Sequence, residues 1–216
     1  MTPMGTCVAV GAADRNRIVS TMRLTEVVSD PTNPLAIEAA IRRRSGEPEV
    51  HLATSHQVLR AQQFSATGAS SHFKLFALVS SGRDTGSKHT EARFLSLHVA
   101  FWLTVLAEFL EPGGGEITYT VLDTPVIEQR IADTVRPQLP AGARFTADPT
   151  RTRGLGYYRS LMLQINAVAD APKSAPANDI GDGGFTDWTA RLMSDAKERC
   201  LISCIAVERL DRPQVS

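Results

Sequence analysis

Arginine is the residue type with which this chain is best equipped to do chemistry. Of its 23 basic residues, 19 are arginines, and a guanidinium group is permanently charged and can bind an oxyanion through two parallel hydrogen bonds. The 23 acidic residues bring the net charge to zero, which argues against a broad electrostatic grip on nucleic acid or anionic lipid. A local basic pocket stays compatible with this composition.

Other common catalytic and metal-binding patterns are missing from the sequence. It contains no His-Glu-x-x-His, Gly-x-Ser-x-Gly or Walker segment. The five histidines are scattered, and His98 falls within an apolar helical stretch, where we expect a hydrogen-bonded core residue. Cys200 and Cys204 have no ligand partners at metal-binding spacing, so we predict buried free thiols and no metal site.

The elements that must position any site are predicted from periodicity. The clearest is a helix over about 88–110, whose apolar residues recur at helical spacing until Pro112 and three glycines end it. Shorter helices are expected over 34–44, 124–139 and within 183–197, and strands over 49–53, 56–62, 72–80, 117–123, 154–168 and 200–210. Hairpin loops are expected at 64–71 and 171–178, and the Gly-rich segment 181–184 by itself indicates no more than a turn. This mixed order predicts an α+β fold with a mostly antiparallel sheet flanked by helices.

The length of 216 residues, with 43% hydrophobic residues, is that of one globular domain spanning 1–216. The N-terminus has no basic start followed by a long apolar run, and no apolar run reaches about 18 residues. We therefore expect a cytoplasmic protein without a membrane span.

Three blocks in the last third of the chain resemble, in order, the catalytic core of histidyl-tRNA synthetase, a class II aminoacyl-tRNA synthetase. Arg153-Gly154-Leu155-Gly156-Tyr157-Tyr158 is similar to the family's Arg-Gly-Leu-Asp-Tyr-Tyr segment, Gly183–Asp187 to its Gly-Gly-Arg-Tyr-Asp segment, and Glu208-Arg209-Leu210 to its Glu-Arg-Leu. Further upstream, 58–62 is similar to the Phe-Arg-x-Glu of the second class-defining motif, and 30–43 to an Arg-Pro-Asp-Leu-Thr-x-Pro segment. The resemblance covers about residues 30–210.

The resemblance implies a cleft in which a sheet holds a nucleotide and an amino acid side by side. By position, Arg60 would meet the α-phosphate, Arg209 the γ-phosphate, and Arg153 the reacting carboxyl–phosphate centre. We therefore expect these three arginines to converge on one cleft. The matched blocks add further candidates, which are Tyr157 and Tyr158 as catalytic residues and Gln62, Glu208 and Asp187 as anion- or nucleotide-binding residues.

The departures from the family pattern concern the substrate. Gln62 replaces the acidic residue of the second motif, and the apolar Leu75 and Val79 stand where a Gln and a Glu read the substrate in the family. Gly156 and Phe185 replace an Asp and an Arg. A pocket that loses buried hydrogen-bonding partners rejects its old ligand by orders of magnitude, so we predict neither histidine activation nor tRNA binding. We also expect this domain to lack the family's first motif and its anticodon-binding domain.

Three functions are compatible with these features. The favoured one is a subunit of a small-molecule biosynthetic enzyme of specialised metabolism, which binds an anionic amino-acid-like substrate in an arginine-lined cleft. Ring closure with loss of sulfate or phosphate, as in aziridine formation, is one such reaction. The second is ATP-dependent adenylation of an amino acid or a carrier-protein-linked acid, for which ATP and magnesium would be the cofactors. The third is a non-catalytic regulatory subunit like that of ATP phosphoribosyltransferase, which also resembles histidyl-tRNA synthetase.

A second protein subunit is expected in each case. In class II cores the first motif covers the edge of the sheet, and without it unpaired N–H and C=O groups and apolar surface would be exposed. The partner that covers this edge would be either a copy of this chain or a divergent homologue.

Overall fold

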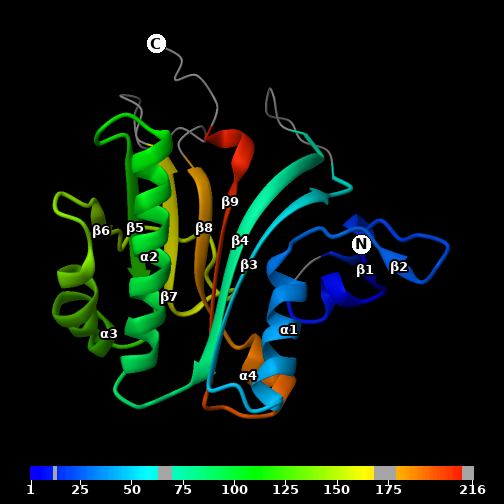
Figure 1. Ribbon diagram of the computed structural model, residues 1–216, viewed down its shortest axis with the longest axis horizontal. Coiled ribbons are helices and arrows are strands. Elements are labelled where there is room, and N and C mark those ends of the chain that lie inside the picture. The colour runs from blue at the N-terminus through cyan, green and yellow to red at the C-terminus, as the bar shows by residue number, and fades with distance from the viewer. Residues whose placement is uncertain (12–13, 63–69, 168–178, 211–216) are drawn as a thin grey trace.

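A seven-stranded sheet forms the centre of the protein in the computed structural model, which describes residues 1–11, 14–62, 70–167 and 179–210 (Figure 1). The strands lie in the order β3-β4-β9-β8-β7-β5-β6, and all neighbours pair antiparallel except β5 and β6. Their bounds are β3 (Glu49–Leu59), β4 (His72–Arg83), β5 (Gly115–Val121), β6 (Phe145–Ala147), β7 (Arg159–Ala167), β8 (Asp179–Thr186) and β9 (Glu198–Ala206). The prediction of an α+β fold with a mostly antiparallel sheet is confirmed.

Helices cover both faces of this sheet. The long helix α2 (His89–Phe109) and the short α3 (Pro125–Arg130) pack on one face, while α1 (Thr32–Arg44) and α4 (Trp188–Met193) lie on the other (Figure 1). A π-helical segment at Ile131–Val135 and a 3-10 turn at Arg136–Gln138 continue α3. The N-terminal segment contributes the two-residue strands β1 (Thr2–Pro3) and β2 (Thr25–Glu26), which pair beside α1.

The alternation of side chains along the central strands divides the core in two. On β7, Leu161 and Leu163 are fully buried on the α2 side, whereas Met162 between them is buried on the α1 side. On β9, Leu201 and Ile202 divide in the same way. Because both faces are covered, these strands read as nearly continuous apolar runs.

Three sequence-based predictions of elements are wrong. The two strands predicted over 49–53 and 56–62 are one strand, β3, because Thr54 and Ser55 pair with β4 like their neighbours; this strand ends at Leu59, so residues 60–62 lie beyond it. Residues 154–158 form a turn that precedes β7, with the amide groups of Tyr157 and Tyr158 both donating to the carbonyl of Gly154. The Gly-rich segment 181–184 is the middle of β8, not a turn. The predicted hairpin loops lie largely (64–71) or wholly (171–178) outside the described residues.

The glycines of β8 are explained by close backbone approach. A Cβ atom on Gly183 would lie 2.6 Å from the carbonyl oxygen of Ile202, and one on Gly184 would lie 2.5 Å from the ring of Tyr158. Both distances are far below contact distance, so these positions exclude every other residue type without movement of the neighbours.

A chain of hydrogen-bonded side chains crosses the α2 side of the core. Ser80 on β4 lies 2.8 Å from Nδ1 of His51 and 2.9 Å from Nε2 of His98. The other ring nitrogen of His98 lies 2.8 Å from the Ser203 hydroxyl, to which Trp102 also donates. Burial lowers the pKa of His98 from 6.5 to about 3, with a further contribution from His51. The predicted role of His98 as a hydrogen-bonded core residue is confirmed.

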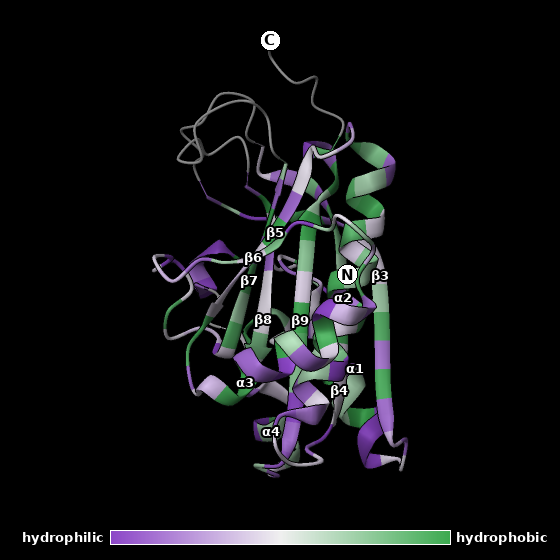
Figure 2. Ribbon diagram, turned by 90° about the vertical axis from the view of Figure 1, so that its left-hand side faces the viewer, coloured by the Kyte–Doolittle hydropathy of each residue, from purple (hydrophilic) through white to green (hydrophobic). Residues whose placement is uncertain are grey.

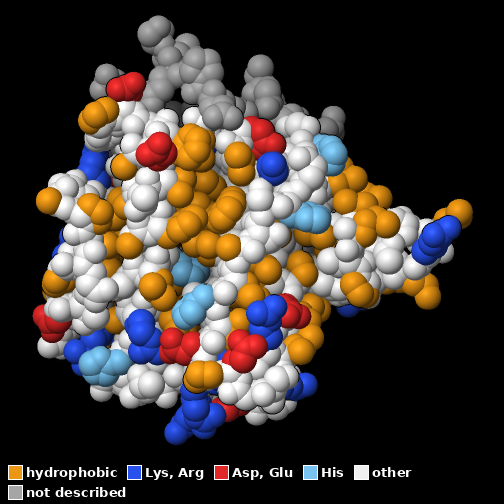
Figure 3. Space-filling model, in the orientation of Figure 1, with side chains coloured by type: hydrophobic (Ala, Val, Ile, Leu, Met, Phe, Trp, Pro, Cys, Tyr) orange, Lys and Arg blue, Asp and Glu red, His pale blue; other side chains and the backbone are white. Residues whose placement is uncertain are grey.

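Among the described residues, no strand pairs with the outer edge of β3, although the amide of Leu59 at its end donates to the carbonyl of Val28, and part of the outer surface of α2 is exposed. Strand β3 ends the sheet, and its polar and apolar residues alternate as colour bands in Figure 2. Hydrophobic side chains gather on the face that carries α2 (Figure 3), and Leu97, Phe101 and Phe109 of this helix are exposed. Helix α2 is also long and apolar enough to cross a bilayer. Half of its most apolar stretch is buried in the core, however, and packing on the sheet accounts for that composition.

Candidate functional site

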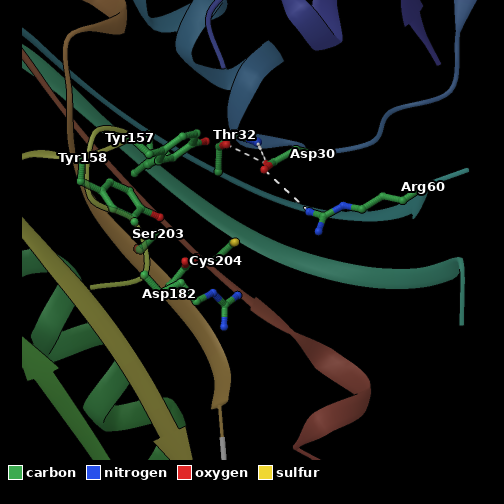
Figure 4. Close-up of a pocket in the computed structure, with 11 residues that line it drawn as sticks. Asp30, Thr32, Arg60, Tyr157, Tyr158, Asp182, Ser203 and Cys204 are labelled. Atoms are coloured by element: carbon green, nitrogen blue, oxygen red, sulfur yellow. Dashed lines mark hydrogen bonds and ion pairs between the residues drawn. The ribbon is translucent and has the colours of Figure 1, made fainter. Parts of the chain in front are cut away.

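A cleft of about 300 Å³ opens on the α1 side of the sheet (Figure 4). Its walls come from the start of α1, the end of β3, the turn before β7 and the strands β8 and β9. The lining residues are Asp30, Thr32, Arg60, Arg153, Gly154, Tyr157, Tyr158, Asp182, Ile202, Ser203 and Cys204. This volume is at the lower end of the roughly 300–1,000 Å³ typical of small-molecule sites.

One wall is organised by Asp30. Its Oδ1 accepts hydrogen bonds from the amide and the hydroxyl of Thr32, at 3.0 and 2.7 Å, and so caps the start of α1. Its other oxygen lies 3.8 Å from Nη2 of Arg60. Two further contacts position the Arg60 side chain: its Nε donates to the carbonyl of Ser29, and its guanidinium lies over the ring of Phe73. The 3.8 Å separation exceeds a hydrogen bond, so neither the carboxylate nor the guanidinium is saturated by the other.

The turn 151–158 supplies an aromatic wall. Gly154 has φ 99°, and a Cβ there would lie 3.0 Å from the Tyr158 ring, so glycine suits both the turn and the packing of that ring. Tyr157 and Tyr158 meet edge to face at 4.8 Å, and Tyr157 contacts Trp188 in the same way. Burial raises the pKa of both tyrosines, which therefore stay neutral hydrogen-bonding groups.

The opposite wall carries Asp182 on β8 (Figure 4). Burial raises the pKa of this carboxyl above its usual 3.8, while the positive charges of Arg151 and Arg153 act in the opposite direction. Nη2 of Arg151 lies 3.6 Å from Asp182, and the Arg151 side chain is only 5% exposed. The guanidinium of Arg153 is paired instead with the carboxylate of Asp179. The cleft therefore brings two cations, Arg60 and Arg153, into one space with two carboxylates, Asp30 and Asp182.

The floor of the cleft is β9. Cys204 is the thiol that borders the cavity, and burial raises its pKa well above that of an ordinary cysteine, so it is protonated at neutral pH. Of the two predicted buried free thiols, Cys200 is fully buried, whereas Cys204 is partly exposed to the cleft; Cys7 is also buried. In the described part of the chain, no group of three His, Cys, Asp or Glu side chains is placed to hold a metal ion.

The sequence-based candidates fall into two groups. Arg60, Arg153, Tyr157 and Tyr158 line the cleft together, and Gln62 borders an adjoining cavity, where it accepts a hydrogen bond from Arg17.

The remaining candidates do not line the cleft. Of the three arginines expected to converge on it, Arg60 and Arg153 line it, and Arg209 lies beside it at Asp179, the residue with which Arg153 is paired. Arg209 donates to the carbonyl of Asp179, Glu208 accepts from the amide of Lys74, and Asp187 pairs with Arg159 and Arg191 at the start of α4. Arg209 follows β9 in a 3-10 turn at Val207–Arg209, and the carboxylate of its partner Asp179 is paired with Arg153. Leu75 and Val79 are buried in apolar clusters, as their residue types indicate.

Asp30 and Asp182 are the cleft residues that sequence reasoning did not single out. Asp30 opens the 30–43 segment that resembles the family, so a signal for it was present. Asp182 was hidden in the segment predicted as a turn. Its alternation with the glycines of β8 was the available signal, because residues two apart on a strand share a face.

The comparisons with known proteins concern the fold. No family model matches the chain, and no curated protein sequence is significantly similar to it. Among solved structures, an ATP phosphoribosyltransferase regulatory subunit/histidyl-tRNA synthetase from Bacillus halodurans C superposes with a TM-score of 0.66 at 12% identity, covering 98% of this chain and 74% of the other. Histidyl-tRNA synthetase from Nostoc sp. PCC 7120 superposes with a TM-score of 0.65 at 15% identity, covering 97% of this chain and 66% of the other. Histidyl-tRNA synthetase from S. aureus superposes with a TM-score of 0.61 at 15% identity. The match covers 89% of this chain and 53% of the synthetase, so this chain spans about half of that protein's length. The fold is therefore that of a histidyl-tRNA synthetase-like class II core.

Proposed function

We propose that this chain is a ligand-binding subunit that takes up one amino-acid-like molecule in the cleft and acts, in a regulatory role, on a second protein chain. The observation that carries the proposal is that two arginines, Arg60 and Arg153, line the same cavity of about 300 Å³ as two carboxylates, Asp30 and Asp182. An α-amino acid presents one carboxylate and one ammonium group, and each finds groups of opposite charge here. The volume suits one such molecule.

The protonation states of the lining residues favour binding over nucleophilic catalysis. The pKa values of Tyr157, Tyr158 and Cys204 are all raised by burial, so none of these groups is an activated nucleophile at neutral pH. A hydroxyl or thiol that stays neutral is a hydrogen-bond donor, which is what recognition of a small polar ligand requires.

Adenylation is less well supported than a regulatory role. The adenylation alternative assigns Arg209 to the γ-phosphate, and the guanidinium of this residue is bound to the carbonyl of Asp179 outside the cleft. The similar protein from Bacillus halodurans C carries a regulatory-subunit name, and this supports the regulatory alternative.

The proposal of a second subunit is supported by open surface. Strand β3 ends the sheet, and Leu97, Phe101 and Phe109 of α2 are exposed on the neighbouring face (Figure 3). A stable interface that covers such a surface buries on the order of 1,600 Å² or more. Light scattering on the chain alone and co-expressed with its genomic neighbours tests this part, and a monomer under both conditions contradicts it.

Asp182 favours a second candidate function, the enzymatic one. A carboxyl whose pKa is raised by burial can act as a general acid or base nearer to neutral pH. In that case the cleft would hold an amino acid bearing sulfate or phosphate as leaving group. Release of sulfate or phosphate from such compounds, absent in Asp182→Asn, would establish this function over the regulatory one.

Calorimetric titration with a panel of L-amino acids tests the main proposal. We expect saturable one-site binding that weakens about tenfold or more in Asp182→Asn and in Arg153→Gln, because each variant removes a charge-assisted contact. Arg159→Gln is the matched control, since this arginine is 59% exposed and lies outside the cleft. ATP–pyrophosphate exchange measured in parallel should be absent. Failure of every amino acid to bind the purified chain contradicts the proposal, and amino-acid-dependent exchange replaces it with adenylation.

A further inference from the structure

A second cavity of about 240 Å³ adjoins the cleft and shares three of its residues, Asp30, Arg60 and Tyr157. Its remaining walls come from the N-terminal segment, from the loop before α1 and from the residues that follow β3. These residues are Gly11, Asp14, Arg17, Ile18, Ser29, Asn33 and Gln62. The two cavities are therefore adjacent compartments, with the incompletely paired Asp30 and Arg60 between them.

The N-terminal wall of this second compartment is fastened to the body of the domain. The amide of Ala61 donates to the carbonyl of Arg17, and Nη1 of Arg17 donates to Oε1 of Gln62 at 2.7 Å. On the other side, the amide of Gly11 donates to Oδ1 of the buried Asn33 at 2.9 Å. Contacts at both ends hold this wall against the domain, which a preformed binding site requires.

The charged groups that line the second compartment are two guanidinium groups, Arg17 and Arg60, and two carboxylates, Asp14 and Asp30. Nη1 of Arg17 donates a hydrogen bond to Gln62, and Nε of Arg17 lies 3.6 Å from the carboxylate of Asp14. Nε of Arg60 donates a hydrogen bond to the carbonyl of Ser29. Because a guanidinium has five N–H donors, both arginines keep donors for a ligand. Ser29 also lines this compartment, and its carbonyl is the group that accepts from Arg60.

We propose that the second compartment binds an oxyanion-bearing side chain of the amino acid whose α-amino and α-carboxylate groups occupy the first. The inference rests on the proposed amino-acid-binding function and specifies its ligand class. The ligand would be an amino acid with a second acidic group at the end of its side chain. Arg17 and Arg60 would bind that group through charge-assisted hydrogen bonds. Tyr157, which borders both compartments, would line the path between them.

Two amino acids of equal chain length separate the contributions of the compartments. L-2-aminoadipate carries a terminal carboxylate, whereas L-norleucine ends in a methyl group, and both present the same α-amino and α-carboxylate groups. We expect calorimetry on the full chain to show aminoadipate binding about 10- to 100-fold more tightly, as one or two charge-assisted hydrogen bonds would give. O-phospho-L-serine serves as a third ligand and shows whether phosphate is preferred to carboxylate as the terminal oxyanion.

Arg17→Gln tests the second compartment by itself. We expect this variant to bind aminoadipate about tenfold or more weakly while its affinity for norleucine is unchanged. Arg23→Gln is the matched control, because Arg23 is an exposed arginine of the same N-terminal segment and lines neither compartment. Thermal unfolding of both variants checks that the wall remains in place.

The outcomes separate this inference from the function on which it rests. Equal affinities of the three ligands, unchanged in Arg17→Gln, would overturn the second compartment and leave the amino-acid cleft standing. An equal loss of norleucine and aminoadipate affinity in Arg17→Gln would also overturn it, since the residue would then act on the whole site. Absence of binding by every ligand to the wild-type chain would overturn both proposals together.

Discussion

His98 should make the stability of this protein depend on pH between about 6.5 and 3. In the folded state its ring is 3% exposed and bonded to Ser80 and Ser203, and its pKa is lowered to about 3. In the unfolded chain the ring titrates near 6.5. Between these two values the unfolded state binds one more proton than the folded state, so the stability present above pH 6.5 is lost as the pH falls toward 3.

The size of this effect follows from the two pKa values. Linkage gives a loss of about 2 kcal/mol in the free energy of unfolding between pH 7.5 and pH 5, and of about 5 kcal/mol when the pH has fallen to 3 or below. For a chain of this length, 2 kcal/mol corresponds to a fall of roughly 4–8 °C in the unfolding temperature. A loss of this order is a large fraction of the roughly 5–15 kcal/mol that stabilises a typical domain.

Urea unfolding of wild type and His98→Gln at a series of pH values from 7.5 to 5 measures the contribution. We expect the variant to be less stable at pH 7.5, because the hydroxyl groups of Ser80 and Ser203 lose a partner. Its free energy of unfolding should, however, fall by about 2 kcal/mol less than that of wild type over this range. His89→Gln is the control, since His89 is exposed at the start of α2 and its replacement should leave the wild-type pH dependence intact. Parallel curves for wild type and His98→Gln, or a His98 ring that titrates near 6.5 by NMR, would refute the reasoning.

Three further predictions concern the core and the cleft. Glu198→Gln should cost about 3–5 kcal/mol in urea unfolding, because the Arg43–Glu198 ion pair is 10% and 1% exposed and its loss leaves a buried guanidinium unpaired; a cost below about 1 kcal/mol, as for a surface pair, would contradict this. Gly184→Ala should cost about 1–3 kcal/mol and weaken ligand binding, because the new methyl group collides with the Tyr158 ring; wild-type behaviour in both unfolding and calorimetry would count against it. Amino-acid affinity should fall as the pH is lowered through the raised pKa of Asp182, above its usual 3.8, because a protonated carboxyl no longer attracts an ammonium group; calorimetry across pH should show this fall in wild type and not in Asp182→Asn.

Local patterns were enough to predict most of the elements. The helix expected over 88–110 is α2, because its apolar residues recur at the period of a helix and Pro112 follows it. The sequence blocks around Arg60 and over 153–158 also identified residues that line one cleft. The short turn that carries Tyr157 and Tyr158 depends on Gly154 and Gly156, which adopt positive φ within the same block. These features depend on residues close together in the chain, and such residues leave a signal in the sequence.

Tertiary structure alone decided which charged residues meet. Asp182 faces the cleft because β8 pairs with β9 in the register that places Asp182 opposite Cys204, and the glycines around it are explained by the strands on either side. Arg209 does not line the cleft but donates to the carbonyl of Asp179 beside it, although its block matched the family pattern as well as that of Arg153 did. Arg17 is held beside the cleft by contacts with Ala61 and with Gln62, which lies 45 residues further along the chain. Register and long-range packing are set by many residues together, so no short segment of the sequence records them.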